Sequence, residues 1–223
     1  MKTITALALV LLCGCSGEFS PTPRQLKSAN DQVDLVKLRR SLESISAWHR
    51  KNNTGLEPSL RPGLSRSELA PELLFGKCTL SEELKTLWSW HDGERAEVPF
   101  IWYHDFLPFE DAKSEYRWLL LNPLVRWDPR FIPILSFEGE WYGAYCGSMS
   151  GDAGPIVHFN LEDGARVTAT NLTTFMATMA EALESGAVEW TRDGMVESIR
   201  KIMEIHRRHN PGLEFPYYVP DGA

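Results

Sequence analysis

The sequence predicts an α+β fold, a single domain in which N-terminal and C-terminal helices pack on a central antiparallel sheet. Three observations predict it. Apolar residues recur at three- and four-residue steps early in the chain, short β-rich runs separated by turn residues occupy the middle, and two further amphipathic runs close it. Helices, then a strand meander, then helices again is the order typical of an α+β domain.

Composition and charge limit the class of protein. The chain has 223 residues and is 43% hydrophobic, which is enough for a real core and argues against disorder. Its formal net charge of −7 argues against a nucleic-acid partner, because nucleic-acid-binding domains are usually basic. Such a charge suits a basic protein partner, although many soluble proteins are equally acidic.

The N-terminus resembles a bacterial lipoprotein signal peptide. Lys2 precedes the apolar run Ile4–Leu12, which is shorter than the roughly 20 residues that span a bilayer. Two small residues and Cys15 follow, in the order of a lipobox, whose last cysteine receives lipid. We expect residues 1–14 to be the signal peptide and Cys15 to be lipidated. The alternatives are an ordinary signal peptide cleaved nearby and a core helix.

Residues 15–30 are expected to hold the lipidated cysteine and a polar tether that lets the domain stand off the membrane. Ser16, directly after the cysteine, is typical of outer-membrane sorting in enterobacteria. The predicted location is therefore the cell envelope, on the periplasmic face of the outer membrane, with the inner membrane as the alternative. The lipid is the expected means of membrane attachment, because the sequence holds no second long apolar segment.

An apolar stripe predicts the first helix. The stripe consists of Leu35, Leu38, Leu42, Ile45 and Trp48. Polar residues and a glycine at 52–55 end it. Further along, Ser65 and Glu68 match a capping box, in which the two side chains satisfy free backbone amides at a helix start.

A second capping box, Thr79 with Glu82, predicts another helix. Gly93 is well placed to end that helix, because glycine adopts the left-handed conformation at little cost. Residues 90–92 would then lie at a helix C-terminus and in the loop that follows.

The middle of the chain predicts a strand meander. The predicted strands are 98–103, 131–137, 141–146, 156–160 and 166–169. Turn residues at 138–140 and 162–164 predict hairpins between neighbouring strands. Pro133 favours a sheet edge or the start of its strand, because proline cannot donate a backbone hydrogen bond.

Two amphipathic runs predict the closing helices. The first run is Leu172, Phe175, Met176, Met179 and Leu183, and the second is Met195, Ile199, Ile202 and His206. The domain is expected to span residues 31–210. Residues 211–223 form an apolar, proline-rich tail that lies across the domain, docks into a partner or swaps into a second copy.

The order of these segments, together with several short motifs, resembles the SUKH superfamily. The matching motifs are residues 60–65, 80–85, 90–93, 106–112, 127–135, 154–159 and 171–186. The resemblance runs from roughly Leu35 to Trp190. This superfamily includes the fungal Smi/Knr cell-wall regulators and many bacterial toxin-immunity proteins.

The resemblance implies an α+β fold, a protein partner, no cofactor and no enzymatic activity. Bacterial members typically bind and neutralise a toxin in the cytosol, whereas a lipoprotein faces the envelope. We therefore expect an immunity protein that binds an envelope-acting toxin. The alternatives are a scaffold or regulator of cell-envelope or cell-wall assembly, and an enzyme whose active site is not recognised.

The residues themselves predict no metal site. His91-Asp92 invites a metal-hydrolase interpretation, but such a site needs further ligands on facing elements. His49 and His104 have no local spacing that pairs them with it.

No catalytic nucleophile is predicted either. The segment 147–151 has Met149 where a nucleophile elbow requires serine. Cys146 and His158 could act as a thiol and its base, but both fall on predicted strands and nothing predicts a lowered thiol pKa.

Partner contacts are expected where aromatic residues lie beside acids in loops, because exposed aromatic side chains often anchor interfaces. The candidate residues are Trp90, His91, Asp92, Trp127, Asp128 and Asp152. The alternative is that the rings pack on the sheet and the acids are solvated.

Cys78 and Cys146 are the two cysteines outside the predicted leader and lipobox. An oxidising envelope permits a disulfide between them. Two buried free thiols are the alternative, because the sequence does not give their distance.

Overall fold

The structure, a computed structural model, describes residues 23–69, 79–95, 98–123, 125–146, 152–162, 164–192 and 194–213. The expected signal peptide, the lipidation site Cys15, Cys78 and most of the expected tail lie outside these residues. Within the described ranges, no helix has both the length and the apolar character needed to cross a membrane.

The chain alternates between helices and short strands. The helices are α1 (Pro23–Asp31), α2 (Leu35–Asn52), α3 (Leu56–Ser59), α4 (Glu82–Trp90), α5 (Phe109–Leu121), α6 (Leu172–Glu184) and α7 (Ile199–His209). The strands are β1 (Leu60–Pro62), β2 (His91–Glu94), β3 (Asp105–Phe106), β4 (Phe131–Phe137), β5 (Glu140–Tyr145), β6 (Ile156–Asn160), β7 (Gly164–Ala169), β8 (Val188–Thr191) and β9 (Gly194–Glu197).

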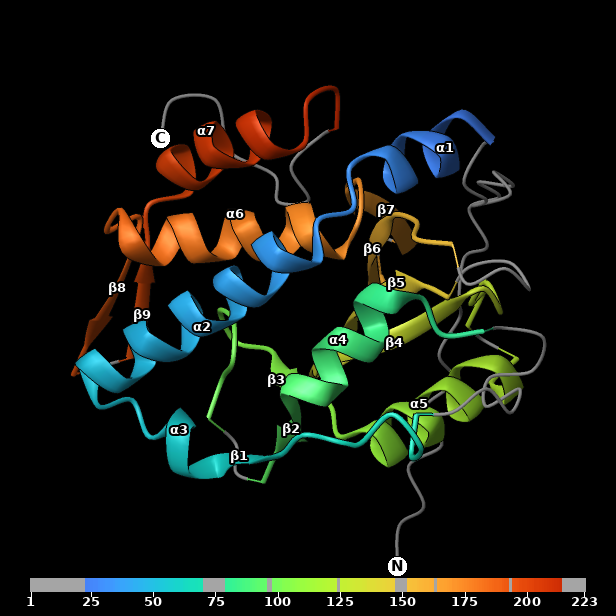
Figure 1. The fold of residues 1–223 in the computed structure, drawn as a ribbon, viewed down its shortest axis with the longest axis horizontal. Coiled ribbons are helices and arrows are strands. Elements are labelled where there is room, and N and C mark those ends of the chain that lie inside the picture. The colour runs from blue at the N-terminus through green and yellow to red at the C-terminus, as the bar shows by residue number, and fades with distance from the viewer. Residues whose placement is uncertain are drawn as a thin grey trace, which may run out of the picture.

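An antiparallel sheet in the order β3-β4-β5-β6-β7 forms the centre of the domain, which confirms the predicted α+β class. Successive side chains of a strand point to opposite faces. On one face Tyr142 contacts Phe175 of α6, with ring centroids 5.0 Å apart, and on the other Trp141 meets Trp118 of α5 at 5.8 Å. Helices α6 and α5 therefore cover opposite faces, and α2, α4 and α7 surround α6 (Figure 1).

The strongest sequence patterns are confirmed. Helix α2 begins at Leu35, where the side chain of Asp34 accepts a hydrogen bond from Lys37 N at 2.9 Å, and ends at Asn53 in the left-handed conformation. The β4–β5 hairpin turns at Glu138 and Gly139, both with positive φ, as a tight two-residue turn requires.

The expected tether is corrected at its C-terminal end. From Pro23 the chain is helical, and Ala29 is fully buried. Asn171 Nδ2 donates to Ala29 O at 2.8 Å, and Asn30 Oδ1 accepts from Ala153 N at 2.9 Å. Helix α1 is therefore attached to the domain, and only the part of residues 15–30 that precedes Pro23 is left for a tether.

The helix that was expected from the Thr79–Glu82 box begins two residues later than that box implies. Its N-cap is Ser81, whose side chain accepts from Leu84 N at 3.3 Å. The helix ends at Trp90, and the chain then enters β2. Gly93 lies inside that strand, and a Cβ there would stand 2.2 Å from Pro108 N, so close backbone approach explains this glycine.

Two other expectations are wrong. Residues 98–103 form no strand, since only a single bridge joins Ile101 to His104. Met195, which was placed on the last helix, lies instead in β9, and that helix begins at Ile199. Met195 stands four residues before Ile199, so its spacing matches the stripe of α7 although it lies in a strand.

Candidate functional site

Asp92 makes two polar contacts within the domain. Its carboxylate is buried, and Oδ1 accepts from Phe109 N at 2.8 Å at the N-terminus of α5. Oδ2 lies 3.1 Å from Arg61 Nη2. A helix N-terminus favours a negative charge, so Asp92 serves as a cap and not as a partner contact. Its burial argues against the expected partner contact.

Trp127 is also a structural residue. It is buried, and its Nε1 donates to Phe131 O at 2.8 Å. Trp90 and His91 are half-buried, and each is already hydrogen-bonded: Trp90 Nε1 donates to Glu43 Oε1 at 3.0 Å, and His91 Nδ1 lies 2.8 Å from Arg61 O. Unlike Asp92 and Trp127, Trp90 and His91 keep surface that a partner could reach.

Asp128 and Asp152 both act electrostatically on Tyr145. Burial raises the pKa of Tyr145, Arg130 opposes this rise, and the charges of the two aspartates add to it. Asp128 Oδ1 accepts from the backbone N and the Nε of Arg130, both at 2.9 Å, so its charge is largely matched within the domain. Asp152 is exposed. The six expected contact residues therefore do not form one surface.

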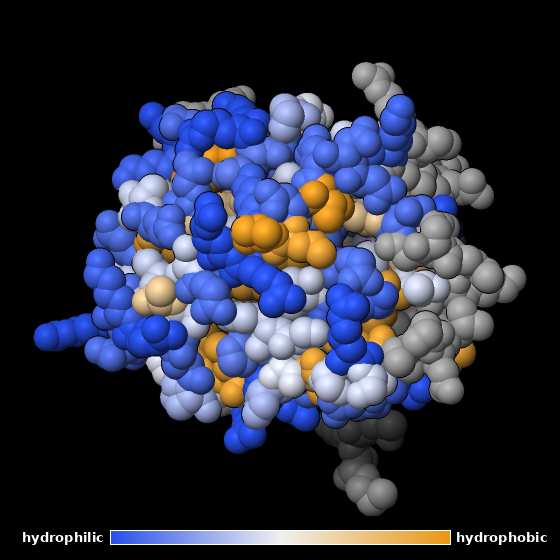
Figure 2. Space-filling model, in the orientation of Figure 1, coloured by the Kyte–Doolittle hydropathy of each residue, from blue (hydrophilic) through white to orange (hydrophobic). Residues whose placement is uncertain are grey.

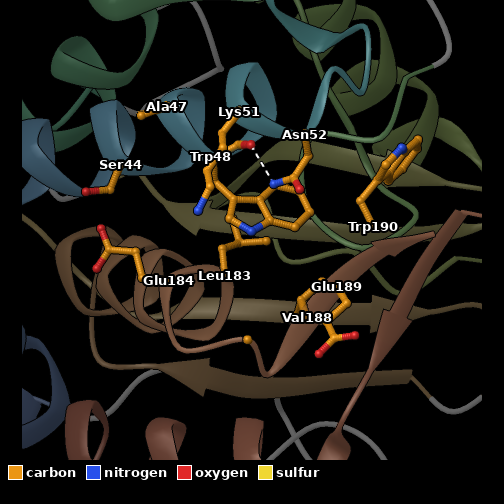
Figure 3. Close-up of a pocket in the computed structure, with 11 residues that line it drawn as sticks. Ser44, Ala47, Trp48, Lys51, Asn52, Leu183, Glu184, Val188, Glu189 and Trp190 are labelled. Carbon is orange, nitrogen blue, oxygen red and sulfur yellow. Dashed lines mark hydrogen bonds between the residues drawn. The ribbon is translucent and has the colours of Figure 1, made fainter.

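The surface in view along α2 is mostly hydrophilic, with small apolar patches separated by polar residues (Figure 2). A groove of about 570 Å³ opens between α2, the C-terminal end of α6 and β8. Figure 3 shows Trp48 in the middle of it, above Leu183, with Glu184 to one side and Val188 and Glu189 to the other. Trp190 lines the far end.

The groove combines aromatic surface with charge. Trp48 and Trp190 are half-buried, and each leaves part of its ring accessible. Glu184 and Glu189 are exposed acids, against a single exposed cation, Lys51. Two indoles flanked by acids match the chemistry expected of a protein-binding anchor, but on residues that the sequence analysis did not select.

A second polar site, separate from the groove, lies on the central sheet where β5 begins. Glu140 opens β5 opposite Asn160, and His158 lies opposite Tyr142, so Glu140 and His158 are diagonal neighbours on one sheet face. His158 Nε2 is 3.1 Å from Glu140 Oε2, and His104 Nε2, from the residue before β3, is 3.9 Å from the same oxygen. One ligand atom from each of these three residues lies within 4.8 Å of the others.

His104 is neutral in this position. Its burial, and secondarily the nearby His158, lower the pKa of His104 to about 3. Neither ring nitrogen has a hydrogen-bond partner among the described residues. The sequence alone does not reveal this cluster, because its three residues come from three separate segments. The alternation of side chains in β5 and β6 was the available signal for Glu140 and His158.

A pocket of about 550 Å³ leads to this cluster. Its lining includes His104 and Glu140, and its rim carries three exposed apolar side chains, Tyr103, Val196 and Ile199. The β9 carboxylate Glu197 also faces the pocket, where burial raises its pKa. Two of the three cluster residues, His104 and Glu140, therefore line the wall of this pocket.

Cys146 is not a free thiol. It is fully buried and disulfide-bonded, which removes it as a nucleophile for His158. Cys78 lies outside the described residues, so the Cys78–Cys146 pairing stays a prediction.

The comparison with protein families agrees with the fold. Residues 70–178, from the segment before α4 through the sheet and into α6, match the SMI1 / KNR4 family (SUKH-1). This match supports the resemblance to the SUKH superfamily. No curated protein matches the sequence. The groove of Figure 3 lies outside the matched segment, since it is built from residues of α2 and from Leu183 onwards.

Proposed function

We propose that this protein is a lipid-anchored SUKH protein-binding domain of the bacterial envelope, and that it confers immunity to an envelope-acting toxin. The SUKH match carries the proposal, because bacterial domains of this class are protein-binding and immunity modules. The lipobox-like sequence at Cys15 supports an envelope location.

The groove between α2 and β8 is the proposed docking surface. Its two half-buried indoles supply apolar contact area, and Glu184 and Glu189 favour a basic side chain on the partner. The formal net charge of −7 favours the same kind of partner. The proposed occupant is therefore a toxin segment that presents a basic residue beside an apolar one.

A cross-linked pull-down from native membranes, analysed by mass spectrometry, tests the proposal. Wild-type protein should capture one stoichiometric toxin, and Trp48→Ala and Trp190→Ala should each lose most of that capture. Trp118→Ala is the matched control, because Trp118 is a 47% exposed indole on the distant helix α5. Equal capture by all three variants would exclude the groove, and a stoichiometric partner from envelope assembly would replace immunity with a scaffold role.

The anchor has its own test. Cys15→Ala should abolish labelling with a radioactive or clickable fatty acid and release the domain from membranes. Normal lipid labelling of this variant would contradict the assignment. Ser16→Ala is the control, since it leaves the expected acceptor thiol in place.

A further inference from the structure

The imidazole ring of His104 is buried without the hydrogen bonds that its nitrogens require. Its side chain is 1% exposed, and both ring nitrogens lack hydrogen-bond partners among the described residues. A neutral imidazole has one N–H donor and one lone pair, and leaving such groups unsatisfied in the interior destabilises a protein. Glu140 Oε2 lies 3.9 Å from its Nε2, beyond hydrogen-bond distance.

The surrounding chemistry is that of a metal-ligand set. Two imidazoles and one carboxylate suit divalent first-row metals and especially Zn²⁺, which accepts three protein ligands and keeps one position open. Tetrahedral Zn²⁺ with bonds of about 2.0–2.1 Å needs ligand atoms about 3.4 Å apart. Here the carboxylate oxygen is 3.1 Å from His158 Nε2 and 3.9 Å from His104 Nε2. Side-chain adjustments of less than an ångström bring these contacts to that separation.

The supporting contacts favour the same assignment. Asn160 Nδ2 donates to Glu140 Oε1 at 2.7 Å, which fixes the carboxylate and leaves Oε2 turned toward the two histidines. Hydrogen bonds of this kind orient metal ligands. His104 and Glu140 also line the pocket, so an ion has a route to them.

We propose that His104, Glu140 and His158 bind one Zn²⁺ ion whose fourth coordination position opens into the pocket beside β9. A water molecule, or a donor atom of whatever enters that pocket, completes the coordination. The site is independent of the groove of Figure 3, so it stands whether or not the groove binds a toxin.

The direct test is zinc binding to the full-length lipidated protein, purified in detergent and stripped with a chelator. Competition against a chromophoric chelator should show one Zn²⁺ per chain. His104→Leu and Glu140→Gln should remove binding, and Asn160→Ala should weaken it by roughly 10–100-fold because it removes only the supporting hydrogen bond.

His209→Asn is the matched control. His209 also contacts a carboxylate, with Nε2 2.7 Å from Glu181 Oε2, but it lies on α7 outside the cluster. This variant should bind zinc like the wild type. Zinc retained at full affinity by His104→Leu, or no stoichiometric zinc on the wild-type protein, would overturn the proposal.

Thermal unfolding gives a readout that a purely structural role would not reproduce. Without metal, His104→Leu should unfold at a temperature equal to or above that of the wild type, because leucine of similar volume removes two unsatisfied nitrogens. With excess zinc the order should reverse, because only the wild type is stabilised by the ligand. The same order in both conditions would contradict a zinc site and show that His104 has only a packing role.

Discussion

Two buried histidines in this domain differ in whether their ring nitrogens have hydrogen-bond partners. His49, on α2, is as buried as His104, but both of its ring nitrogens are used: Nε2 lies 3.0 Å from Phe100 O, and Nδ1 lies 2.7 Å from Thr54 Oγ1. Since a carbonyl only accepts, Nε2 carries the hydrogen and Thr54 donates to Nδ1. Burial keeps both histidines neutral, lowering the pKa of His49 to about 4 and that of His104 to about 3. Burial alone therefore does not distinguish the two histidines, whereas the hydrogen bonds of their ring nitrogens do.

The largest expected effect comes from removing His49. His49→Leu should lower the free energy of unfolding by about 3 kcal/mol, because it leaves Phe100 O and the Thr54 hydroxyl without their buried partner. His104→Leu, measured in the same chelator-containing buffer, should change it by less than about 1 kcal/mol. Urea unfolding followed by tryptophan fluorescence measures both. Equal losses of unfolding free energy for the two variants would contradict the claim that the hydrogen bonds of His49 stabilise the fold more than the ring of His104 does.

Two buried glutamates, Glu94 and Glu83, also differ in the hydrogen bonds of their carboxylates. Glu94 Oε1 accepts from Phe106 N at 3.2 Å, but no donor among the described residues reaches Oε2, and Asp105 lies beside the carboxyl group. Burial, then the charge of Asp105, raise the pKa of Glu94 to about 9. Glu83 differs in its hydrogen bonds, because Thr173 N and Oγ1 donate to its Oε1 at 2.7 and 2.6 Å at the start of α6. Burial raises the pKa of Glu83 as well, and these hydrogen bonds oppose that rise.

Glu94 should therefore make stability depend on pH. The folded state holds a proton that the unfolded state has lost once the pH exceeds about 4.5, so the stability contributed by this group is complete below that pH and falls as the pH rises toward about 9. Glu94→Gln should raise the free energy of unfolding by about 2 kcal/mol at pH 8 and flatten the decline. Denaturant titrations at pH 5, 7 and 9 check this, and Glu197→Gln is a less buried control on β9. A wild type whose stability does not fall over this range would refute it.

The sequence predicted the parts of the fold that local patterns determine. The stripes that define α2 and α6 are long and regular, and the turn at Glu138-Gly139 requires positive φ. By contrast, β8 and β9 are four residues each, too short for alternation to distinguish them from the spacing of the neighbouring helices. Short apolar runs of this kind are ambiguous without their partner strand.

The candidate sites were harder to predict because they depend on register between distant segments. His104 reaches Glu140 only because β3 and β5 both flank β4, and no spacing along the chain records that arrangement. The same limit explains the aromatic residues. The sequence places Trp48 on an apolar helix stripe and Trp127 beside an acid in a loop, yet Trp127 is buried and Trp48 lines a groove.

The smallest expected effect concerns Asp92, which the sequence suggested as a partner contact and the structure shows as a helix cap. Asp92→Asn keeps an oxygen that can accept from Phe109 N but loses the charge that faces Arg61, so it should lower the free energy of unfolding by about 1 kcal/mol. Partner capture in the pull-down should not change, because the side chain is buried. Capture lost at unchanged stability would mean that the surface around β2, and not the groove lined by Trp48, contacts the partner.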